Sequence, residues 1–252
     1  MKIVEWNINC RSSQGGIPKM VAEELLRTNP DIVCLTEFVK GENYHDFVDK
    51  LNNLGYETFN DPRTIEYSGN EILIAIKSEY AVETETFVIC NDDNNPNFLH
   101  VVSKINDENY HFIGARIKIG GNDLNEDFIN RRTQLQSLMS EISKIEDEPV
   151  VVLGDFNNGW FTDSQNKDSY SGKPRQFYSY PLLVEEMKSI NFKANTPEID
   201  CSWGYGFKLD HAFTNNFVDV KNVSYSWDFE QNPAYKKKTV GYPDHAMLLV
   251  TL

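Results

Sequence analysis

The chain has 252 residues, of which 40% are hydrophobic and 12% aromatic, enough apolar material for one sizeable core. Its 24 Lys and Arg against 38 Asp and Glu leave a formal net charge of −14, which argues against a protein that coats nucleic acid nonspecifically. An enzyme acting on phosphoesters stays compatible with this charge, because a bound divalent cation inverts the local charge of an acidic cleft. We expect a single domain over residues 1–252.

The sequence shows no leader or membrane-spanning pattern. Its first residues hold no run of seven apolar side chains, and no window approaches 18 apolar residues. We therefore expect a cytoplasmic protein without membrane contact. The four cysteines lie far apart without Cys-x-x-Cys spacing, which predicts reduced, packed thiols: Cys10, Cys34, Cys90 and Cys201.

The chain begins with alternating strands and helices, predicted at Lys2–Ile8, Ile17–Arg27, Asp31–Leu35 and Tyr44–Leu54. A meander of four strands is expected next, at Glu71–Ile76, Ala81–Ile89, Leu99–Ile105 and Tyr110–Ile119. A long amphipathic helix is marked by Leu135, Leu138, Met139, Ile142 and Ile145. The last elements are a buried strand, a helix and three strands, at Val150–Leu153, Pro181–Ser189, Leu209–Thr214, Val218–Trp227 and Ala246–Leu252. The pattern favours a strand-dominated α/β architecture with two sheets.

Polar residues recur at the ends of four predicted strands: Asn7 and Asn9, Glu37, Asp155 and Asn157, and Asp244 and His245. Strand ends converge in stacked sheets, so these groups could share one pocket. Carboxylate and amide oxygens are ligands for Mg²⁺ or Mn²⁺, whereas a zinc site would draw on several His or Cys. Taken singly, each group also fits a helix cap, an Asx turn or a loop pair.

Taken together, these segments resemble the endonuclease/exonuclease/phosphatase superfamily over nearly the whole chain. The resemblance is carried by Trp-Asn-Ile-Asn at 6–9, Leu-Thr-Glu-Phe at 35–38, Gly-Asp-Phe-Asn at 154–157, Leu-Asp-His-Ala-Phe at 209–213 and Pro-Asp-His-Ala at 243–246. The closing motif departs from the family's Ser-Asp-His at Pro243. The resemblance implies an α/β, DNase I-like four-layer sandwich of two packed mixed β-sheets flanked by helices.

The same resemblance implies roles for these residues in metal-dependent hydrolysis. A Mg²⁺ or Mn²⁺ ion would be held by Glu37 with Asn7 or Asn9 and Asp244.

In the catalytic set that the resemblance implies, Asp155 would accept the proton of the attacking water and Asn157 would donate to a phosphate oxygen. His245 would meet the phosphate as an imidazolium oriented by Asp210. We expect His211, which alternates with Asp210 along its strand, to be structural.

Three residues are predicted to contact substrate. Arg116 stands where many family members carry a His or Tyr, and it is either a phosphate clamp or an exposed strand-end residue. Arg175 and Trp203 belong to a segment rich in aromatic and basic residues, which suits stacking of splayed bases. The net charge predicts that nucleic acid is bound only weakly outside the site, and no protein partner is indicated.

Two functions follow from the sequence. The first is a metal-dependent nuclease that cuts DNA or RNA. The alternative is a phosphatase or phosphodiesterase for a small or lipid-linked phosphoester, which the net charge of −14 favours. A noncatalytic scaffold is disfavoured because all of the acidic and His positions of the implied site remain.

Overall fold

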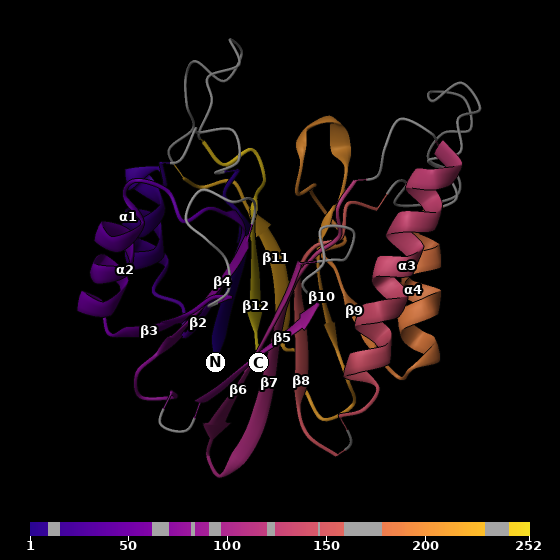
Figure 1. Cartoon of the computed structure of the whole chain (residues 1–252), viewed down its shortest axis with the longest axis horizontal. Helices are drawn as coiled ribbons and strands as arrows, with labels where there is room; N and C mark the ends of the chain where they lie inside the picture. The colour runs from indigo at the N-terminus through magenta and orange to yellow at the C-terminus, as the bar shows by residue number, and fades with distance from the viewer. Residues whose placement is uncertain are drawn as a thin grey trace.

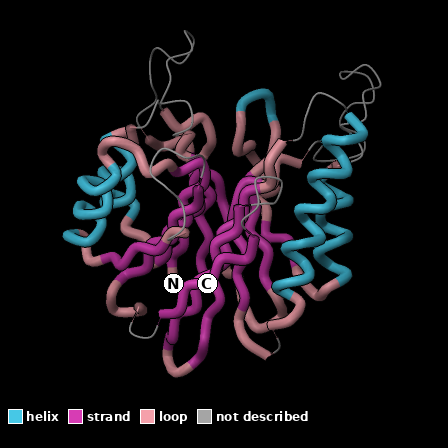
Figure 2. The backbone as a smooth tube through the Cα atoms, in the orientation of Figure 1, coloured by secondary structure: helices cyan, strands magenta, loops and turns pink. Residues whose placement is uncertain are grey.

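The computed structural model describes residues 1–9, 16–61, 71–81, 84–90, 97–119, 124–145, 147–158, 178–229 and 242–252. Two β-sheets face each other, and a pair of helices covers the outer face of each sheet (Figures 1 and 2). This order of helix, sheet, sheet and helix confirms the predicted four-layer α/β sandwich.

Within the described ranges, each sheet has six strands and contains both parallel and antiparallel neighbours. The first sheet, here sheet A, consists in order of β11 (Asn222–Ser226), β12 (Met247–Thr251), β1 (Lys2–Asn7), β2 (Ile32–Phe38), β4 (Glu71–Lys77) and β3 (Tyr56–Phe59). The second, sheet B, consists of β5 (Thr84–Cys90), β6 (Asn97–Ile105), β7 (Glu108–Arg116), β8 (Val150–Asp155), β10 (Asp210–Thr214) and β9 (Lys193–Asn195). The parallel pairs β1–β2 and β7–β8 lie near the middle of the two sheets.

In the part of the chain that the structure describes, three apolar clusters fill the spaces between the four layers. Helices α1 (Lys19–Thr28) and α2 (Tyr44–Asn53) pack on sheet A, and α3 (Leu124–Ile142) and α4 (Tyr180–Ser189) pack on sheet B. The central cluster joins the inner faces of the two sheets. The middle strands are therefore apolar on both faces, which explains their continuous apolar runs in the sequence.

The structure corrects several predicted elements. The segment at 71–76 does not join the meander: it forms β4 in sheet A, and only β5, β6 and β7 form successive hairpins in sheet B. The edge strands β3 and β9 were not predicted, because four and three residues are too few to show a period.

Some predicted boundaries are also wrong. The strand expected at 218–227 is only Asn222–Ser226, and β7 ends at Arg116 rather than Ile119. Helix α1 begins at Lys19 because Pro18 has extended backbone angles (φ −58°, ψ 132°). No helix in the described ranges is long and apolar enough to cross a membrane. Cys34 and Cys201 are free thiols, as expected, whereas Cys10 lies outside the described residues.

Candidate active site

Side-chain alternation gathers polar residues on the inner faces of the two sheets. On β1, Glu5 and Asn7 point to the same side as Ile3, which packs in the central core. On β8, Asp155 follows Leu153 on the same inner face. The polar groups therefore form one end of the inter-sheet core, and the predicted convergence of the strand ends is present.

Three charged residues form a row across sheet B. Asp155 on β8 lies in register with Asp210 on β10 and with Arg116 on β7. All three are buried, with Asp210 0% and Asp155 1% exposed. Like charges directly opposite each other in a sheet repel, so Asp155 has an unfavourable neighbour on one side and a favourable one on the other.

Backbone geometry at two positions permits this arrangement. Gly154 has φ +157°, and a Cβ atom there would lie 1.7 Å from the carbonyl oxygen of Ala115. Only glycine fits, which gives a physical reason for the first residue of the Gly-Asp-Phe-Asn motif. Glu37 has φ +52° within an irregularity of the β2–β4 pairing between Leu35 and Phe38. This bulge sets the direction of the Glu37 side chain.

Asp155 is held by two asparagine residues. Its Oδ2 accepts hydrogen bonds from Asn7 Nδ2 at 3.0 Å and Asn157 Nδ2 at 2.9 Å, and its Oδ1 accepts from the Asn157 backbone at 2.9 Å. Burial, with the charge of Asp210, raises the pKa of Asp155 to about 7, although His245 and Arg116 act in the opposite direction. Asp155 is therefore placed to exchange a proton near neutral pH.

Asn157 uses its amide group within the protein. Besides the bond to Asp155, its Nδ2 donates to the carbonyl of Ile117 at 2.8 Å, and the Asn157 backbone carbonyl accepts from Arg131 Nη1. Asp127 in turn accepts from Arg131 at 3.0 Å. In this structure Asn157 thus orients Asp155, and its predicted donation to phosphate stays a prediction.

His245 and Asp210 form a buried ion pair. His245 Nδ1 lies 2.7 Å from Asp210 Oδ2. Burial alone lowers the pKa of His245, but Asp210, with smaller effects of Asp155 and Asp244, raises it to about 10. The imidazole is therefore charged at neutral pH. Ser202 supports the start of β10, since its Oγ accepts from the backbone nitrogen of Asp210 at 3.2 Å.

Arg116 is bonded to Glu37, across the gap between the sheets. Its Nε and Nη2 atoms both donate to Glu37 Oε1, at 3.2 and 2.7 Å. The Arg116 residue is only 5% exposed. The alternative of an exposed strand-end residue is therefore wrong, since the guanidinium is part of the polar cluster, and the role of Arg116 as a phosphate clamp stays a prediction.

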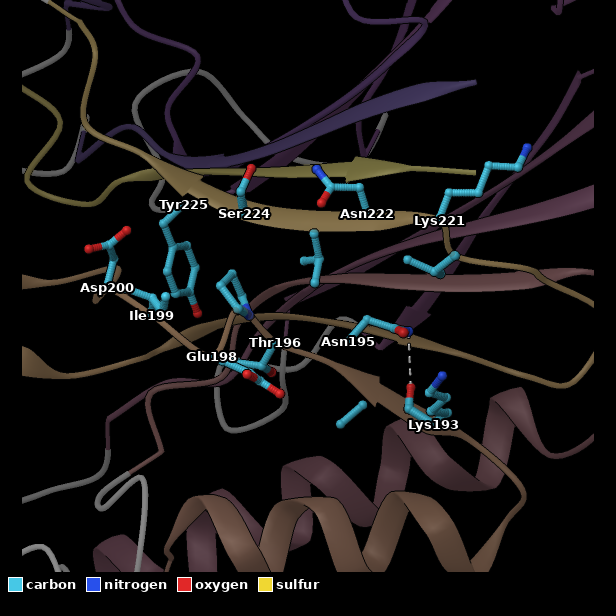
Figure 3. Close-up of a pocket in the computed structure, with 14 residues that line it drawn as sticks. Lys193, Asn195, Thr196, Glu198, Ile199, Asp200, Lys221, Asn222, Ser224 and Tyr225 are labelled. Atoms are coloured by element: carbon cyan, nitrogen blue, oxygen red, sulfur yellow. Dashed lines mark hydrogen bonds between the residues drawn. The ribbon is translucent and has the colours of Figure 1, made fainter.

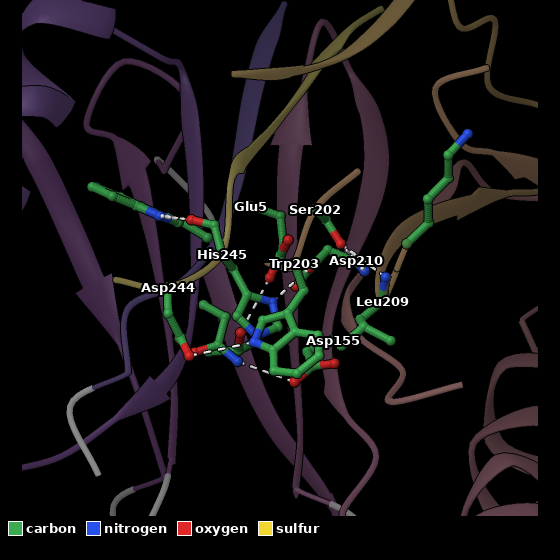
Figure 4. Close-up of polar contacts among 12 residues, drawn as sticks. Glu5, Asp155, Ser202, Trp203, Leu209, Asp210, Asp244 and His245 are labelled. Carbon is green, nitrogen blue, oxygen red and sulfur yellow. Dashed lines mark hydrogen bonds and ion pairs between the residues drawn. The ribbon is translucent and has the colours of Figure 1, made fainter. Parts of the chain in front are cut away.

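The other predicted cation ligands lie at the same end of the sandwich. Asn7 Oδ1 accepts from the backbone of Asn9 at 3.0 Å, and Asn9 Nδ2 donates to the carbonyl of Tyr242 at 3.1 Å. Asp244 Oδ2 accepts from the indole of Trp203 at 3.4 Å. Figure 4 shows Asp244 and Trp203 beside the Asp155, Asp210 and His245 group.

The charge balance of this cluster suits a divalent cation. Among the described residues of the cluster, carboxylates outnumber cationic side chains, with Glu37, Asp155, Asp210 and Asp244 against Arg116 and His245. Burial raises the pKa of Asp244, and the Glu37 carboxylate adds to this rise. No three His, Cys, Asp or Glu side chains in the described ranges form a ready-made cation site, so amide oxygens would have to complete the ligand set. Hard oxygen donors of this kind fit Mg²⁺ or Mn²⁺.

Sequence reasoning missed Glu5. It is 0% exposed, its Oε1 accepts from Thr36 Oγ1 at 3.1 Å, and its Oε2 has no hydrogen-bond partner among the residues that the structure describes. Burial, then Asp210 and Asp155, raises the pKa of Glu5 well above its ordinary value. The available signal was a single Glu two residues before Asn7 in an apolar strand, a spacing that puts both on one face.

His211, Arg175 and Trp203 are the other residues singled out in the sequence. His211 contacts Asn158 Oδ1 at 2.7 Å and Thr196 Oγ1 at 2.8 Å, a structural arrangement as expected. Arg175 lies outside the described residues. The ring of Trp203 is 6.5 Å from that of His245.

A groove of about 530 Å³ lies apart from the polar cluster. Figure 3 shows it between the edge strands β9 and β11, lined by residues 193–200 and 220–225. None of the predicted site residues lines it. Tyr225 lines the groove, and its hydroxyl donates to the Asp210 carbonyl at 2.6 Å.

Residues 4–232 match the model of the endonuclease/exonuclease/phosphatase family, so the chain belongs to this family of phosphoester hydrolases. Its fold is similar to that of a family member from Beutenbergia cavernae, with a TM-score of 0.72, 14% identity and coverage of 99% of this chain and 70% of that chain.

Two other solved structures are similar over nearly their whole length. An AP endonuclease from Archaeoglobus fulgidus has a TM-score of 0.66 and 17% identity, covering 100% of this chain and 99% of that chain. The 3′ phosphatase NExo from Neisseria, bound to a product DNA hairpin, has a TM-score of 0.70 and 15% identity with the same coverages. A sequence search of curated proteins found no match.

Proposed function

We propose that this protein is a divalent-metal-dependent nuclease that hydrolyses phosphodiester bonds of DNA or RNA by in-line attack of an activated water. One observation carries the proposal: Asp155, with a pKa of about 7, lies in register with Asp210, which holds a charged His245. A proton acceptor and a cationic group at one site are what phosphodiester hydrolysis requires. The DNA bound to the Neisseria 3′ phosphatase supports a nucleic acid substrate.

In this proposal each residue acts through the contacts described above. Asp155, oriented by Asn7 and Asn157, accepts the proton of the attacking water. His245 places its charge against the phosphate, and because its Nδ1 is bonded to Asp210, its Nε2 is the atom that meets the substrate.

Glu37 and Asp244, with the amide oxygens of Asn7 or Asn9, would hold the cation. A bound Mg²⁺ or Mn²⁺ would supply Lewis-acid stabilisation of the charge that grows on the phosphate oxygens. Trp203 borders this group, and Arg175 belongs to the same aromatic and basic stretch of the sequence. We propose both as substrate contacts.

The test is an activity panel on labelled single- and double-stranded DNA, RNA and bis-p-nitrophenyl phosphate, with Mg²⁺, Mn²⁺ or EDTA. We expect hydrolysis only with metal, and a loss of about 10²- to 10⁴-fold in kcat for His245→Gln. His100→Gln is the matched control: His100 precedes Val101 of the central core, so its side chain points away from the site. Undiminished rates in EDTA, or equal rates for the two variants, would contradict the proposal.

A second candidate substrate is a small or lipid-linked phosphoester, favoured by the net charge of −14. The same panel separates the two candidates. A nuclease turns over oligonucleotides with a higher kcat/KM than the p-nitrophenyl diester, because contacts remote from the scissile bond add transition-state binding energy. Equal or reversed preference would favour the small phosphoester.

A further inference from the structure

The ion pair of Arg116 and Glu37 holds the carboxylate that the proposed function assigns to the cation. Both hydrogen bonds end on the same oxygen, Oε1, at 3.2 and 2.7 Å. The two side chains are 6% and 14% exposed, so water screens their attraction poorly.

The pair joins the two sheets. Glu37 belongs to β2 of sheet A and Arg116 to β7 of sheet B, 79 residues apart in the sequence. Glu37 is directed by its bulge at φ +52°, and Arg116 is the last residue of β7, in register with Asp155. Two independent backbone features therefore bring the guanidinium to Glu37, and the contact does not depend on a flexible surface side chain.

We propose that Arg116 and the divalent cation compete for Glu37, so that Arg116 lowers the cation affinity of the resting site. This inference depends on the cation site of the proposed function. A cation that binds Glu37 must either displace the guanidinium from Oε1 or lie beside its positive charge. Both routes cost binding free energy, and the coupling is reciprocal: cation binding weakens the hold of Glu37 on Arg116.

The test measures Mn²⁺ binding without substrate, from the electron paramagnetic resonance signal of the free ion. Arg116→Gln should bind Mn²⁺ about tenfold or more tightly than wild type, because the competing charge is gone. Arg116→Lys keeps the charge and should stay near wild type. Arg132→Gln is the control for overall charge, since Arg132 pairs with Glu186 on α4 and is 46% exposed. Arg132→Gln should therefore leave the affinity for Mn²⁺ unchanged.

Each outcome is decisive. Unchanged or weaker Mn²⁺ binding by a folded Arg116→Gln protein overturns the competition while leaving the cation site standing. Absence of Mn²⁺ binding by wild type and all variants overturns both the competition and the cation site of the proposed function.

A measurement on wild-type protein covers the case in which Arg116→Gln does not fold. The Nε–H resonance of Arg116, assigned by its loss in Arg116→Lys, should shift as Mg²⁺ saturates the site. A resonance that stays unchanged at saturation overturns the competition.

Discussion

Replacing Asp155 by asparagine has two opposed effects on stability, and their balance depends on pH. The native carboxyl group has a pKa of about 7, against an ordinary value of 3.8, because it is buried beside Asp210. The native state therefore binds more protons than the unfolded chain between these values. The free energy of unfolding of the wild type consequently falls as pH rises from about 4 to about 7. Asparagine has no charge and removes this dependence.

The size of the first effect follows from the raised pKa of Asp155, and the size of the second from its hydrogen bonds. A difference of about three pKa units corresponds to a pH-dependent free energy on the order of 4 kcal/mol. Against this, Oδ2 of Asp155 accepts from both Asn7 and Asn157, and an amide nitrogen in its place would face two donors. That mismatch costs about 1–3 kcal/mol at any pH. We expect Asp155→Asn to be less stable than wild type near pH 4.5 and to gain relative to it up to pH 7.5.

The assay is urea denaturation of both proteins in EDTA at several pH values from 4.5 to 7.5. Turnover with Mn²⁺ should fall about 10²- to 10⁴-fold in the variant, because an amide cannot accept the proton of water. A stability difference that does not change with pH would refute the desolvation of Asp155. A variant with full turnover would refute its role as base.

Further predictions concern the ion pair, the motif glycine and the surface charge. Asp210→Asn should lower the pKa of His245 and move the basic limb of the kcat/KM profile to lower pH, whereas an unmoved limb would mean that His245 does not act as a cation. Gly154→Ala should destabilise the fold by about 3 kcal/mol or more, since its Cβ would overlap the Ala115 carbonyl; a denaturation midpoint within error of wild type would contradict this. With a net charge of −14, nucleic acid binding should release only about two to four counterions, measured as the slope of log K against log salt concentration, and a slope near ten would be incompatible with this surface.

Local sequence patterns determined where the polar strand ends lie. The apolar runs before Glu37 and Asp155 predict buried strands, because only strands covered on both faces stay apolar throughout. Alternation along the strand puts the side chains of Asp210 and His211 on opposite faces. In the structure, Asp210 pairs with His245, whereas His211 lies between Asn158 and Thr196. These features depend on neighbours within a few residues, and a sequence displays such neighbours directly.

The pairing of groups from different strands was decided by tertiary structure alone. That β4 joins β2 rather than β5, and that Arg116 meets Glu37 from the opposite sheet, depend on the register of strands and on the packing of two sheets. The two hydrogen bonds of the Asn157 amide nitrogen and the burial of Glu5 within reach of the charges of Asp155 and Asp210 arise in the same way. A period of two residues reports which face a side chain takes, but it carries no information on which distant strand that face will meet.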